Sequence, residues 1–316
     1  MSEDKHETVA AVVVTYNRKD LLRQCLDGIL RQTRPVDAIY VVDNASTDGT
    51  PEMIASKYAG RVIYERLSGN VGGAGGFHHG MKRAYEDGHD WIWVMDDDAE
   101  PDSRCLECLL QWAPKEAGCV VPSVVSQSGV RQNYHAKRLK RWPWLREIPE
   151  WFDSPTVLQQ SAIPLDAAGF PGCLVGARVI RSVGLPDPAF FILYDDTDYT
   201  LRISRFYPLY VIPQATLIHK DDRSTTKPAK SEHTNWKTYY AKRNRILLAR
   251  KHEGWAKAIL LFGWHVLRST VGAIRPEARP LGRYLRLRIG GAWAGLAVAK
   301  LGEVERPPQW LRGEPG

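Results

Sequence analysis

The chain has 316 residues, of which 44% are hydrophobic and 25% charged, and this length and composition exclude a disordered, collagen-like or disulfide-scaffold protein. The net charge of +7 is a C-terminal property, because residues 1–226 hold 25 Lys and Arg against 30 Asp and Glu, whereas residues 227–316 hold 18 against 6. Such an excess indicates an acidic partner for the C-terminal part, either nucleic acid or an anionic membrane surface, and the alternative is a plain solvated basic face.

The cysteines and apolar runs bear on the cellular compartment. Five cysteines are an odd number that favours reduced, cytosolic thiols, and the Cys105–Cys108 pair has no second pair at a zinc spacing. The polar N-terminus lacks the apolar stretch of a signal peptide. The apolar runs at 258–267 and 289–299 are shorter than the ~20 residues of a spanning helix. We therefore expect a cytoplasmic protein that touches a membrane without crossing it.

The first hundred residues alternate between short β-branched apolar runs and segments with helical spacing. This alternation predicts a mostly parallel α/β sheet with right-handed crossovers. The predicted strands are residues 8–15, 38–42, 61–65 and 91–95, and the predicted helices are residues 18–32, 50–58 and 76–85.

Two later segments differ in composition from this pattern. Residues 131–151 are basic and rich in tryptophan without a clear period, and we expect them to form a surface excursion. Beyond residue 234, helical patterns rich in Trp, Arg and Lys continue to about residue 301. These helices suit either an anionic membrane interface or packing against the rest of the protein.

Polar groups follow all four predicted strands, at residues 15–17, 43–48, 69–76 and 96–98. Sheets of this kind bind ligands beyond the carboxyl ends of their strands. Three adjacent aspartates, Asp96, Asp97 and Asp98, repel one another, and a divalent cation that also contacts a substrate diphosphate would relieve the repulsion. The alternative is a solvated acidic turn before the next helix.

The glycine cluster at residues 72–76 permits close backbone approach and could present amides to a ligand. Its order does not fit the dinucleotide fingerprint, and the chain has no Gly-Lys-Ser/Thr, so hydride transfer and P-loop phosphoryl transfer lack their motifs. A flexible turn is the alternative interpretation.

A second carboxylate pair, Asp195 and Asp196, follows an aromatic and apolar run. Adjacent carboxylates can ionise unequally, which suits a general base, although helix capping would explain one of them. His219 ends another apolar run and could complete a metal shell from a distant part of the chain, or be an ordinary core or surface histidine.

Together these segments resemble the family 2 glycosyltransferases, inverting enzymes of the GT-A fold. Residues 13–18, 41–50, the Asn70 glycine segment, 96–98, and 195–196 followed by His219 match in order, over about residues 8–225. Within the family, residues 69–77 and 91–98 are most similar to galactofuranosyltransferases of cell-wall galactan. Residues 239–245 are similar to a segment of the enzyme that begins that polymer on a lipid-linked acceptor. Rhamnosyltransferases share much of the pattern.

The resemblance implies a GT-A catalytic domain over residues 1–230, with a nucleotide-sugar half at about 8–100 and an acceptor half at about 101–230. A basic helical region over residues 231–316 follows it. The resemblance implies that the nucleotide-sugar is bound by Thr15, Asn17, Asp43, Asn44, Asn70, Gly73, Asp96 and Asp97. It implies that Mn²⁺ or Mg²⁺ is held by Asp96, Asp98 and His219. The catalytic base would be Asp196, with Asp195 beside it. Many family members have Glu-Asp where this chain has Asp195-Asp196.

The implied reaction moves galactofuranose from UDP-galactofuranose onto a polyprenyl-diphosphate-linked glycan, in cell-envelope polysaccharide synthesis at the inner face of the membrane. The C-terminal helices would contact the anionic lipid surface. The alternatives are transfer of rhamnose from dTDP-rhamnose and a non-catalytic nucleotide-sugar-binding module. We expect no nucleic acid partner, because nucleic acid binding would give neither aspartate cluster a role and the carboxylates would repel the phosphates. The sequence also lacks the glycine- and basic-rich loop that a nucleotidyltransferase usually has after its first strand.

Overall fold

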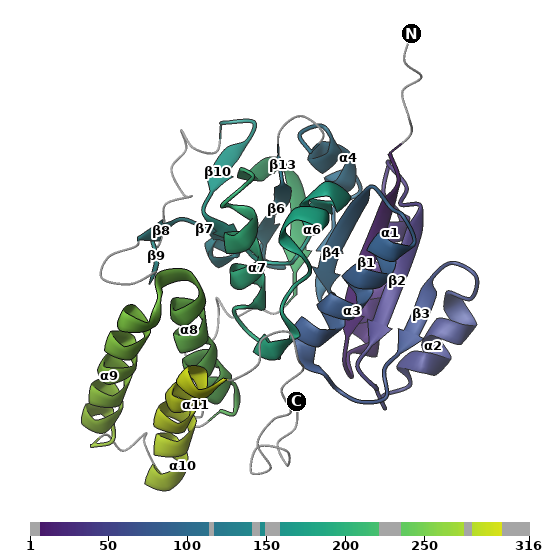
Figure 1. Cartoon of the computed structure of the whole chain (residues 1–316). Coiled ribbons are helices and arrows are strands. Elements are labelled where there is room, and N and C mark those ends of the chain that lie inside the picture. Colours follow the sequence, from purple (N-terminus) through teal and green to yellow (C-terminus); the bar gives the residue numbers. More distant parts are fainter. Residues whose placement is uncertain are drawn as a thin grey trace.

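The computed structural model describes residues 7–113, 117–140, 146–148, 159–220, 235–274 and 280–298. A layered α/β unit forms the larger part, and a group of C-terminal helices lies beside it at the lower left of Figure 1. Within the described residues, nine strands form one mixed sheet.

The N-terminal half of the sheet is parallel, and it confirms the predicted α/β alternation. Strand β1 pairs with β2 on one side and β4 on the other, and β3 follows β2. The elements are β1 (Val9–Thr15), α1 (Lys19–Leu30), β2 (Ala38–Asp43), α2 (Thr50–Lys57), β3 (Ile63–Arg66), α3 (Gly72–Glu86) and β4 (Trp91–Asp96).

Helices cover both faces of this sheet, so its central strands are buried on both sides. Ala11 and Val13 of β1 pack in the cluster that contains helix α1, whereas Ala10 and Val12 pack with Met81 of α3. All seven residues of β1 are buried, which explains its continuous apolar sequence.

Helix α3 begins at Gly72, four residues before the predicted start at residue 76. Its glycines allow close packing on β1, since a Cβ atom at Gly76 would lie 2.5 Å from Cγ1 of Val14. Contact with the sheet therefore outweighs the low helix propensity of glycine.

The second half of the sheet contains both parallel and antiparallel pairs. Strand β12 lies antiparallel between β4 and β6, and β6 pairs in parallel with β13. The short strand β5 pairs with β13 and sets His219 opposite Ala99, beside the end of the aspartate segment. The elements are β5 (Ala99–Pro101), α4 (Cys105–Leu110), β6 (Cys119–Val125), β10 (Ile163–Leu165), β12 (Cys173–Gly176), α6 (Ala177–Val183), η2 (Pro188–Phe190), α7 (Asp195–Ile203) and β13 (Leu209–His219).

The expectation of a surface excursion at residues 131–151 is wrong for its first part. Gln132, Ala136 and Lys137 are buried. This part forms η1 (Asn133–His135) and β7 (Ala136–Lys137), which pairs with β11 (Ala167–Ala168), and a small hairpin of β8 (Leu139–Lys140) and β9 (Arg146–Glu147) follows. Residues 141–145 and 149–151 lie outside the described part of the chain.

The C-terminal helices are attached to the sheet unit through α8. Leu247 packs with Phe190, and Leu248 packs with Leu201 of α7. Helix α9 lies on the outer side and exposes much of its apolar surface. The elements are α8 (Lys237–Glu253), α9 (Trp255–Gly272), α10 (Leu281–Leu285), η5 (Arg286–Gly290) and α11 (Gly291–Ala297).

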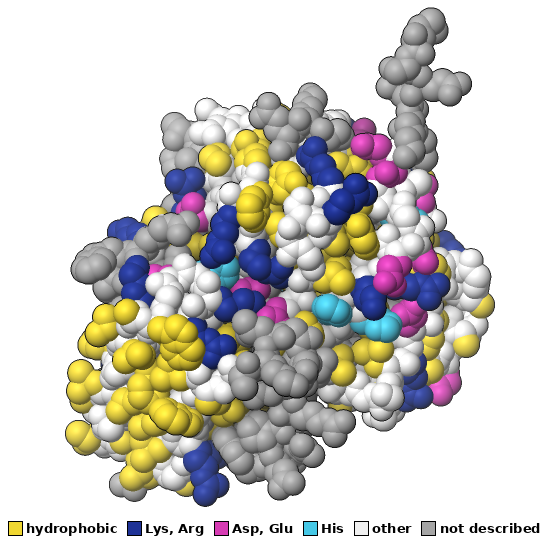
Figure 2. Space-filling view, viewed as in Figure 1, with side chains coloured by type: hydrophobic (Ala, Val, Ile, Leu, Met, Phe, Trp, Pro, Cys, Tyr) yellow, Lys and Arg dark blue, Asp and Glu magenta, His cyan; other side chains and the backbone are white. Residues whose placement is uncertain are grey.

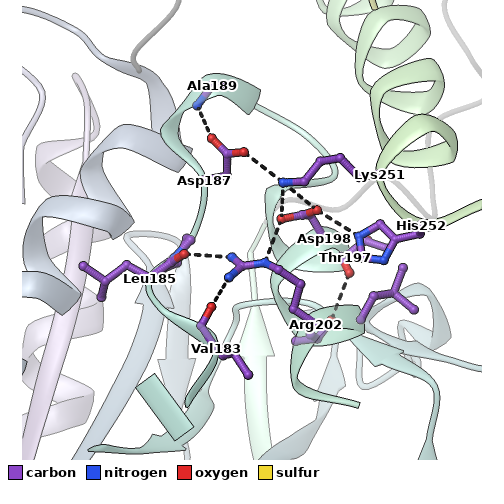
Figure 3. Close-up of polar contacts among 12 residues, drawn as sticks. Val183, Leu185, Asp187, Ala189, Thr197, Asp198, Arg202, Lys251 and His252 are labelled. Atoms are coloured by element: carbon purple, nitrogen blue, oxygen red, sulfur yellow. Dashed lines mark hydrogen bonds and ion pairs between the residues drawn. The ribbon is translucent and has the colours of Figure 1, made fainter. Parts of the chain in front are cut away.

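An ion-pair network joins α8 to α7 (Figure 3). Asp198 of α7 is fully buried and lies 2.9 Å from Nζ of Lys251, 2.9 Å from Nε2 of His252 and 3.2 Å from Nε of Arg202. Burial acts to raise the pKa of Asp198, but His252, Lys251 and Arg202 outweigh it and the net pKa is lowered. The network therefore fixes the helix whose first turn carries Asp195 and Asp196.

Candidate active site

A cleft of about 550 Å³ opens at the carboxyl ends of β1 and β4 and is closed by parts of α7, β13, η1 and α8. Its volume falls in the range of small-molecule sites. The site residues predicted from the sequence that line it are Thr15, Asn17, Asn44, Asn70, Gly73, Asp96, Asp97, Asp98, Asp195, Asp196 and His219.

Asp43 is the exception, because it does not line the cleft and its side chain is fully buried. Its Oδ1 accepts a hydrogen bond from the backbone N–H of Ser46 at 2.8 Å, and its Oδ2 accepts one from the hydroxyl of Tyr64 at 2.5 Å. In this structure Asp43 holds the loop after β2, and its contact with the nucleotide stays a prediction.

The Asp96–Asp98 segment is buried in the wall of the cleft, so the solvated-turn alternative does not hold. Oδ2 of Asp97 accepts a hydrogen bond from Oγ1 of Thr15 at 2.7 Å. Nη1 of Arg18 lies 2.7 Å from Oδ2 of Asp98 and 3.4 Å from Oδ1 of Asp97. Burial raises the pKa of Asp97 to about 6 and that of Asp96 to about 7, the latter also because Asp98 is close.

His219 faces this segment from the end of β13. Its Nε2 lies 3.3 Å from Oδ1 of Asp98, a buried oxygen with no hydrogen-bond partner. Its Nδ1 lies 2.9 Å from Oε1 of Gln132, which also accepts a hydrogen bond from the hydroxyl of Tyr134 at 2.9 Å. In the neutral tautomer with its proton on Nδ1, His219 donates a hydrogen bond to Oε1 of Gln132, and the lone pair of its Nε2 faces Asp98.

The donor atoms at this point suit a divalent cation. An imidazole oriented through its other nitrogen by an amide oxygen is the usual arrangement of a metal-bound histidine, and carboxylate oxygens are typical ligands of Mn²⁺ and Mg²⁺. In the described ranges, however, no three His, Cys, Asp or Glu side chains gather as a metal centre. Of the predicted metal ligands, Asp98 and His219 lie next to each other, and Asp96 lines the same cleft.

The second carboxylate pair begins helix α7. Asp195 is buried, and burial together with the neighbouring Asp196 raises its pKa well above the ordinary value. Oδ2 of Asp196 lies 3.7 Å from Nζ of Lys137, which donates a hydrogen bond to Oγ1 of Thr197 at 2.6 Å. Lys137 is a cleft residue that the sequence did not single out, since it lies in the segment predicted as a surface excursion.

The loop before α7 is held in a strained conformation. Phe191, Leu193 and Tyr194 have φ angles of 62°, 68° and 68°, the left-handed region that non-glycine residues rarely adopt. Nδ2 of Asn244 in α8 lies 2.8, 2.7 and 2.8 Å from the carbonyl oxygens of Phe190, Ile192 and Leu193. One amide group of the C-terminal helices therefore supports the loop that presents both catalytic candidates.

The glycine segment packs against this same loop. A Cβ atom at Gly72 would lie 2.1 Å from the carbonyl oxygen of Phe191, and the N–H of Ala74 donates to that oxygen at 3.1 Å. Oδ1 of Asn70 accepts a hydrogen bond from the N–H of Gly72 at 2.8 Å, and Nδ2 of Asn44 donates to the Gly72 carbonyl at 3.3 Å. Of the five cluster residues, Gly72 and Gly73 line the cleft.

Further lining residues were not predicted from the sequence. Several are aromatic or cationic, and three come from the C-terminal helical region. Among them are Tyr134, His135, Phe170, Trp236, Lys237 and Ala241.

The sheet order, with a carboxylate-lined cleft at the switch between parallel and antiparallel strands, is that of the GT-A fold. The chain belongs to glycosyl transferase family 2, whose family model matches residues 10–179. A similar solved structure is that of GalNAc-T7 with UDP, GalNAc and Mn²⁺, with a TM-score of 0.58 and 13% identity over 90% of this chain and 55% of that chain. That likeness shows the fold.

Two relatives are similar over most of their length. Galactofuranosyltransferase GlfT1 of Mycolicibacterium smegmatis is 30% identical over 295 residues, which cover 89% of this chain and 95% of that protein. The N-acetylglucosaminyl-diphospho-decaprenol L-rhamnosyltransferase of Mycobacterium tuberculosis is 25% identical over 282 residues, which cover 80% of this chain and 88% of that protein. The family and these relatives make the chain a glycosyltransferase, which sets aside the non-catalytic alternative.

Proposed function

We propose that this glycosyltransferase moves galactofuranose from UDP-galactofuranose onto a lipid-linked glycan, with inversion at the anomeric carbon. The similarity to a galactofuranosyltransferase over nearly its whole length supports the donor. The name of the rhamnosyltransferase relative includes a diphospho-decaprenol acceptor, which supports the lipid link. The main observation in favour of this reaction is that Asp195 and Asp196 line the same cleft as the Asp96–Asp98 segment.

The donor would occupy the part of the cleft at the ends of β1 and β4. Thr15, Asn17 and Asn70 offer hydroxyl and amide groups there for the uridine and ribose. Asp98 and His219, with Asp96 nearby, would hold Mn²⁺ or Mg²⁺, which stabilises the charge that grows on the leaving diphosphate when it is bound. Arg18, which forms ion pairs with Asp97 and Asp98, is a further cation at this position.

The acceptor would be activated at the first turn of α7. Asp196 takes the proton of an acceptor hydroxyl, the oxygen bonds to the anomeric carbon, and the bond from that carbon to the diphosphate oxygen breaks, so that UDP leaves with the electron pair. Lys137 compensates the charge of Asp196 and keeps its carboxylate oriented. Burial and the neighbouring Asp196 raise the pKa of Asp195, and in its protonated form Asp195 donates a hydrogen bond to a hydroxyl of the sugar or acceptor.

The membrane contact that we propose lies on α9, whose exposed apolar side chains form the hydrophobic area at the lower left of Figure 2. Leu260 is 67% exposed and Leu267 is 56% exposed. No described helix is long and apolar enough to cross a bilayer. An apolar helix face in a strongly basic region suits the surface of an anionic leaflet, which would make the enzyme peripheral on the inner face of the membrane.

Flotation of the full chain with anionic liposomes tests this contact. We expect the variant with Leu260→Asp and Leu267→Asp to float less than wild type, because charged side chains on this face oppose insertion. Phe206→Asp is the matched control, since Phe206 is 69% exposed on the sheet unit. Equal flotation of all three proteins would remove α9 from the contact.

The donor is tested by thermal stabilisation with UDP, dTDP and GDP, with and without Mn²⁺, followed by release of UDP from UDP-galactofuranose in the presence of a lipid-linked acceptor. A ligand that binds only the native state at ~100 times its dissociation constant adds ~2.7 kcal/mol of stability. We expect metal-dependent stabilisation by UDP. A preference for dTDP with transfer from dTDP-rhamnose would support the rhamnosyltransferase alternative, which the second relative favours.

A further inference from the structure

Trp236 lies directly before helix α8 and lines the active-site cleft. Its side chain is half-buried, so part of the indole is covered by the protein and part is open to the cleft. The proposed transfer reaction gives it no chemical role, since an indole neither exchanges a proton at neutral pH nor offers a ligand atom to a metal. Its place in the cleft therefore points to binding.

Two aromatic contacts fix this indole relative to the loop before α7. The rings of Trp236 and Tyr240 meet edge to face, with centroids 5.8 Å apart and planes at 88°. Tyr240 in turn stacks on Phe191 of the loop, with centroids 5.0 Å apart and planes at 21°. Tyr240 and Phe191 are both buried, and ring pairs of these two kinds are favourable. Trp236 is thus held in place by the segment that leads to Asp195 and Asp196.

These contacts place Trp236 beside the loop that carries the proposed base. Phe191 and Ile192 belong to the same apolar cluster as Trp236, line the cleft as it does, and precede Asp195 in the chain. The donor nucleotide, by contrast, is proposed at the carboxyl ends of β1 and β4. The acceptor has to approach Asp196 to lose its proton, so the acceptor is the substrate nearest to Trp236. This step rests on the proposed function.

The groups around Trp236 suit a ligand that is apolar on one face and polar at its rim. The indole offers an apolar surface, and Asp195 and Asp196 of the same cleft offer oxygen atoms to hydroxyl groups. Lys237 also lines the cleft, and its Nζ lies 5.8 Å from the centroid of the Trp236 ring. A sugar ring has this combination, because its C–H groups form an apolar face and its hydroxyl groups lie around the rim.

We propose that Trp236 binds the acceptor: the C–H face of the acceptor's sugar ring packs on the indole, with the reacting hydroxyl directed towards Asp196. Trp236 thereby selects glycan acceptors and disfavours those whose ring carries a polar group on that face. Water is too small to contact the indole and Asp196 together, so this contact does not assist hydrolysis of the donor.

Steady-state transfer by the full chain tests the proposal, with UDP-galactofuranose as donor and, as acceptor, an octyl disaccharide that the wild type glycosylates. A soluble acceptor keeps the membrane contact of α9 out of the measurement. Packing on the indole acts in the bound substrate and in the transition state alike. Trp236→Leu should therefore raise the acceptor KM about 10- to 100-fold with kcat near that of wild type. An unchanged acceptor KM would overturn the proposal.

Trp236→Phe and Trp112→Leu are the matched variants. Trp236→Phe keeps an aromatic face and should hold the acceptor KM within about threefold of wild type. Trp112→Leu removes a tryptophan that is half-buried like Trp236 but lies outside the cleft lining, and it should leave the acceptor KM unchanged. If Trp236→Phe were as impaired as Trp236→Leu, or Trp112→Leu showed the same rise, an aromatic contact with the acceptor would be excluded.

Hydrolysis of the donor separates acceptor binding from support of the loop. Without acceptor, water attacks the anomeric carbon, Asp196 takes its proton, and galactofuranose and UDP are released. Trp236→Leu should hydrolyse UDP-galactofuranose at the wild-type rate, because the base and the donor site remain intact. A residue that only holds the loop before α7 would slow hydrolysis and transfer together. A parallel fall of both rates would reduce Trp236 to a supporting residue and overturn the proposal.

Fluorine NMR of the full chain labelled with 5-fluorotryptophan gives a readout without turnover. Trp236→Phe identifies the resonance of Trp236 by its loss, and Trp112→Leu identifies that of Trp112. In the presence of UDP and Mg²⁺, the octyl disaccharide should shift the Trp236 resonance in a saturable way and leave that of Trp112 in place. A Trp236 resonance that stays unshifted at saturating acceptor would contradict direct contact.

Failure of this inference and failure of the proposed function give different results. If the wild type transfers galactofuranose and Trp236→Leu keeps the wild-type acceptor KM, the proposed function stands and the role of Trp236 is wrong. If the wild type uses dTDP-rhamnose and not UDP-galactofuranose, the donor assignment is wrong. The same comparison of acceptor KM values with dTDP-rhamnose then decides the role of Trp236.

Discussion

The Asp96–Asp98 segment and the first turn of α7 both present adjacent aspartates to one cleft, but their charges are compensated differently. Arg18 contacts Asp97 and Asp98, and His219 faces Asp98. At α7, Lys137 lies beside Asp196, while among the described residues no cation lies within ion-pair distance of Asp195. Positive charge therefore lies beside two aspartates of the first cluster, whereas in the second cluster Lys137 lies beside Asp196 and burial raises the pKa of Asp195.

Asp196→Asn is expected to produce the largest loss. Without the carboxylate that accepts the proton, turnover should fall by ~10² to 10⁴, whereas stabilisation by UDP should remain near that of wild type. Steady-state kinetics and thermal shifts measure the two effects. If Asp195→Asn abolished turnover and Asp196→Asn did not, the two roles would have to be exchanged.

Asp198→Asn tests the third charged position of the same helix, which has a structural role. It leaves Lys251, Arg202 and His252 without their carboxylate, so the free energy of unfolding should drop by about 3–5 kcal/mol at pH 7. Chemical denaturation measures this change. Glu86→Gln removes one partner of an exposed pair with Lys82 and should cost at most about 1 kcal/mol.

The pH dependence of Asp198 has a definite sign. Its folded-state pKa is lowered, so its contribution to stability is present above the unfolded-state value and is lost as the pH falls through the folded-state value. In wild type, acid therefore weakens this contribution, and Asp198→Asn should reduce the acid-side slope of stability against pH. An unchanged slope would argue against a charged Asp198.

Gln132→Leu tests how the histidine beside the Asp96–Asp98 segment is oriented. It removes the oxygen that orients His219, and the Mn²⁺ concentration for half-maximal stabilisation by UDP should rise about 10- to 100-fold. Gln127→Leu is the control, because Gln127 is exposed on a turn. A metal requirement equal to that of wild type would show that Gln132 does not position a metal ligand.

Asn244→Leu has the smallest expected effect and tests the strained loop before α7. Loss of its amide removes this donor from the carbonyl groups of Ile192 and Leu193, which should cost about 1–3 kcal/mol of stability. The loop carries Asp195 and Asp196, so kcat should fall while the affinity for UDP stays constant. A loss of stability with unchanged kcat would limit Asn244 to a structural role.

Much of the parallel half of the sheet could be predicted from the sequence. Strands buried on both faces need continuous apolar residues, and β1 and β4 show them plainly. Because polar residues end each strand, the positions of Thr15 and Asp96 in one cleft followed from topology alone. The start of α3 was misplaced, since its glycines take helical conformation only through packing on β1 and Phe191.

The supporting residues could not be found in this way. Lys137 contacts a residue 60 positions away, and Gln132 contacts one 87 positions away. Both lie in a segment without periodicity, and their residue types are those of an ordinary surface. Asn244 lies in a helix and shows no local sign that its amide holds a loop 51 to 54 residues earlier.

The amino-acid sequence by itself determined the alternation of strands and helices in the first half, the two carboxylate clusters and the basic C-terminal helices, because periodicity and residue type act over a few neighbours. The tertiary structure decided which cation meets which carboxylate, which residues support the loop before α7, and which aromatic rings hold Trp236 at the cleft. Those outcomes depend on side chains from distant segments, whose distances exist only after the chain has folded.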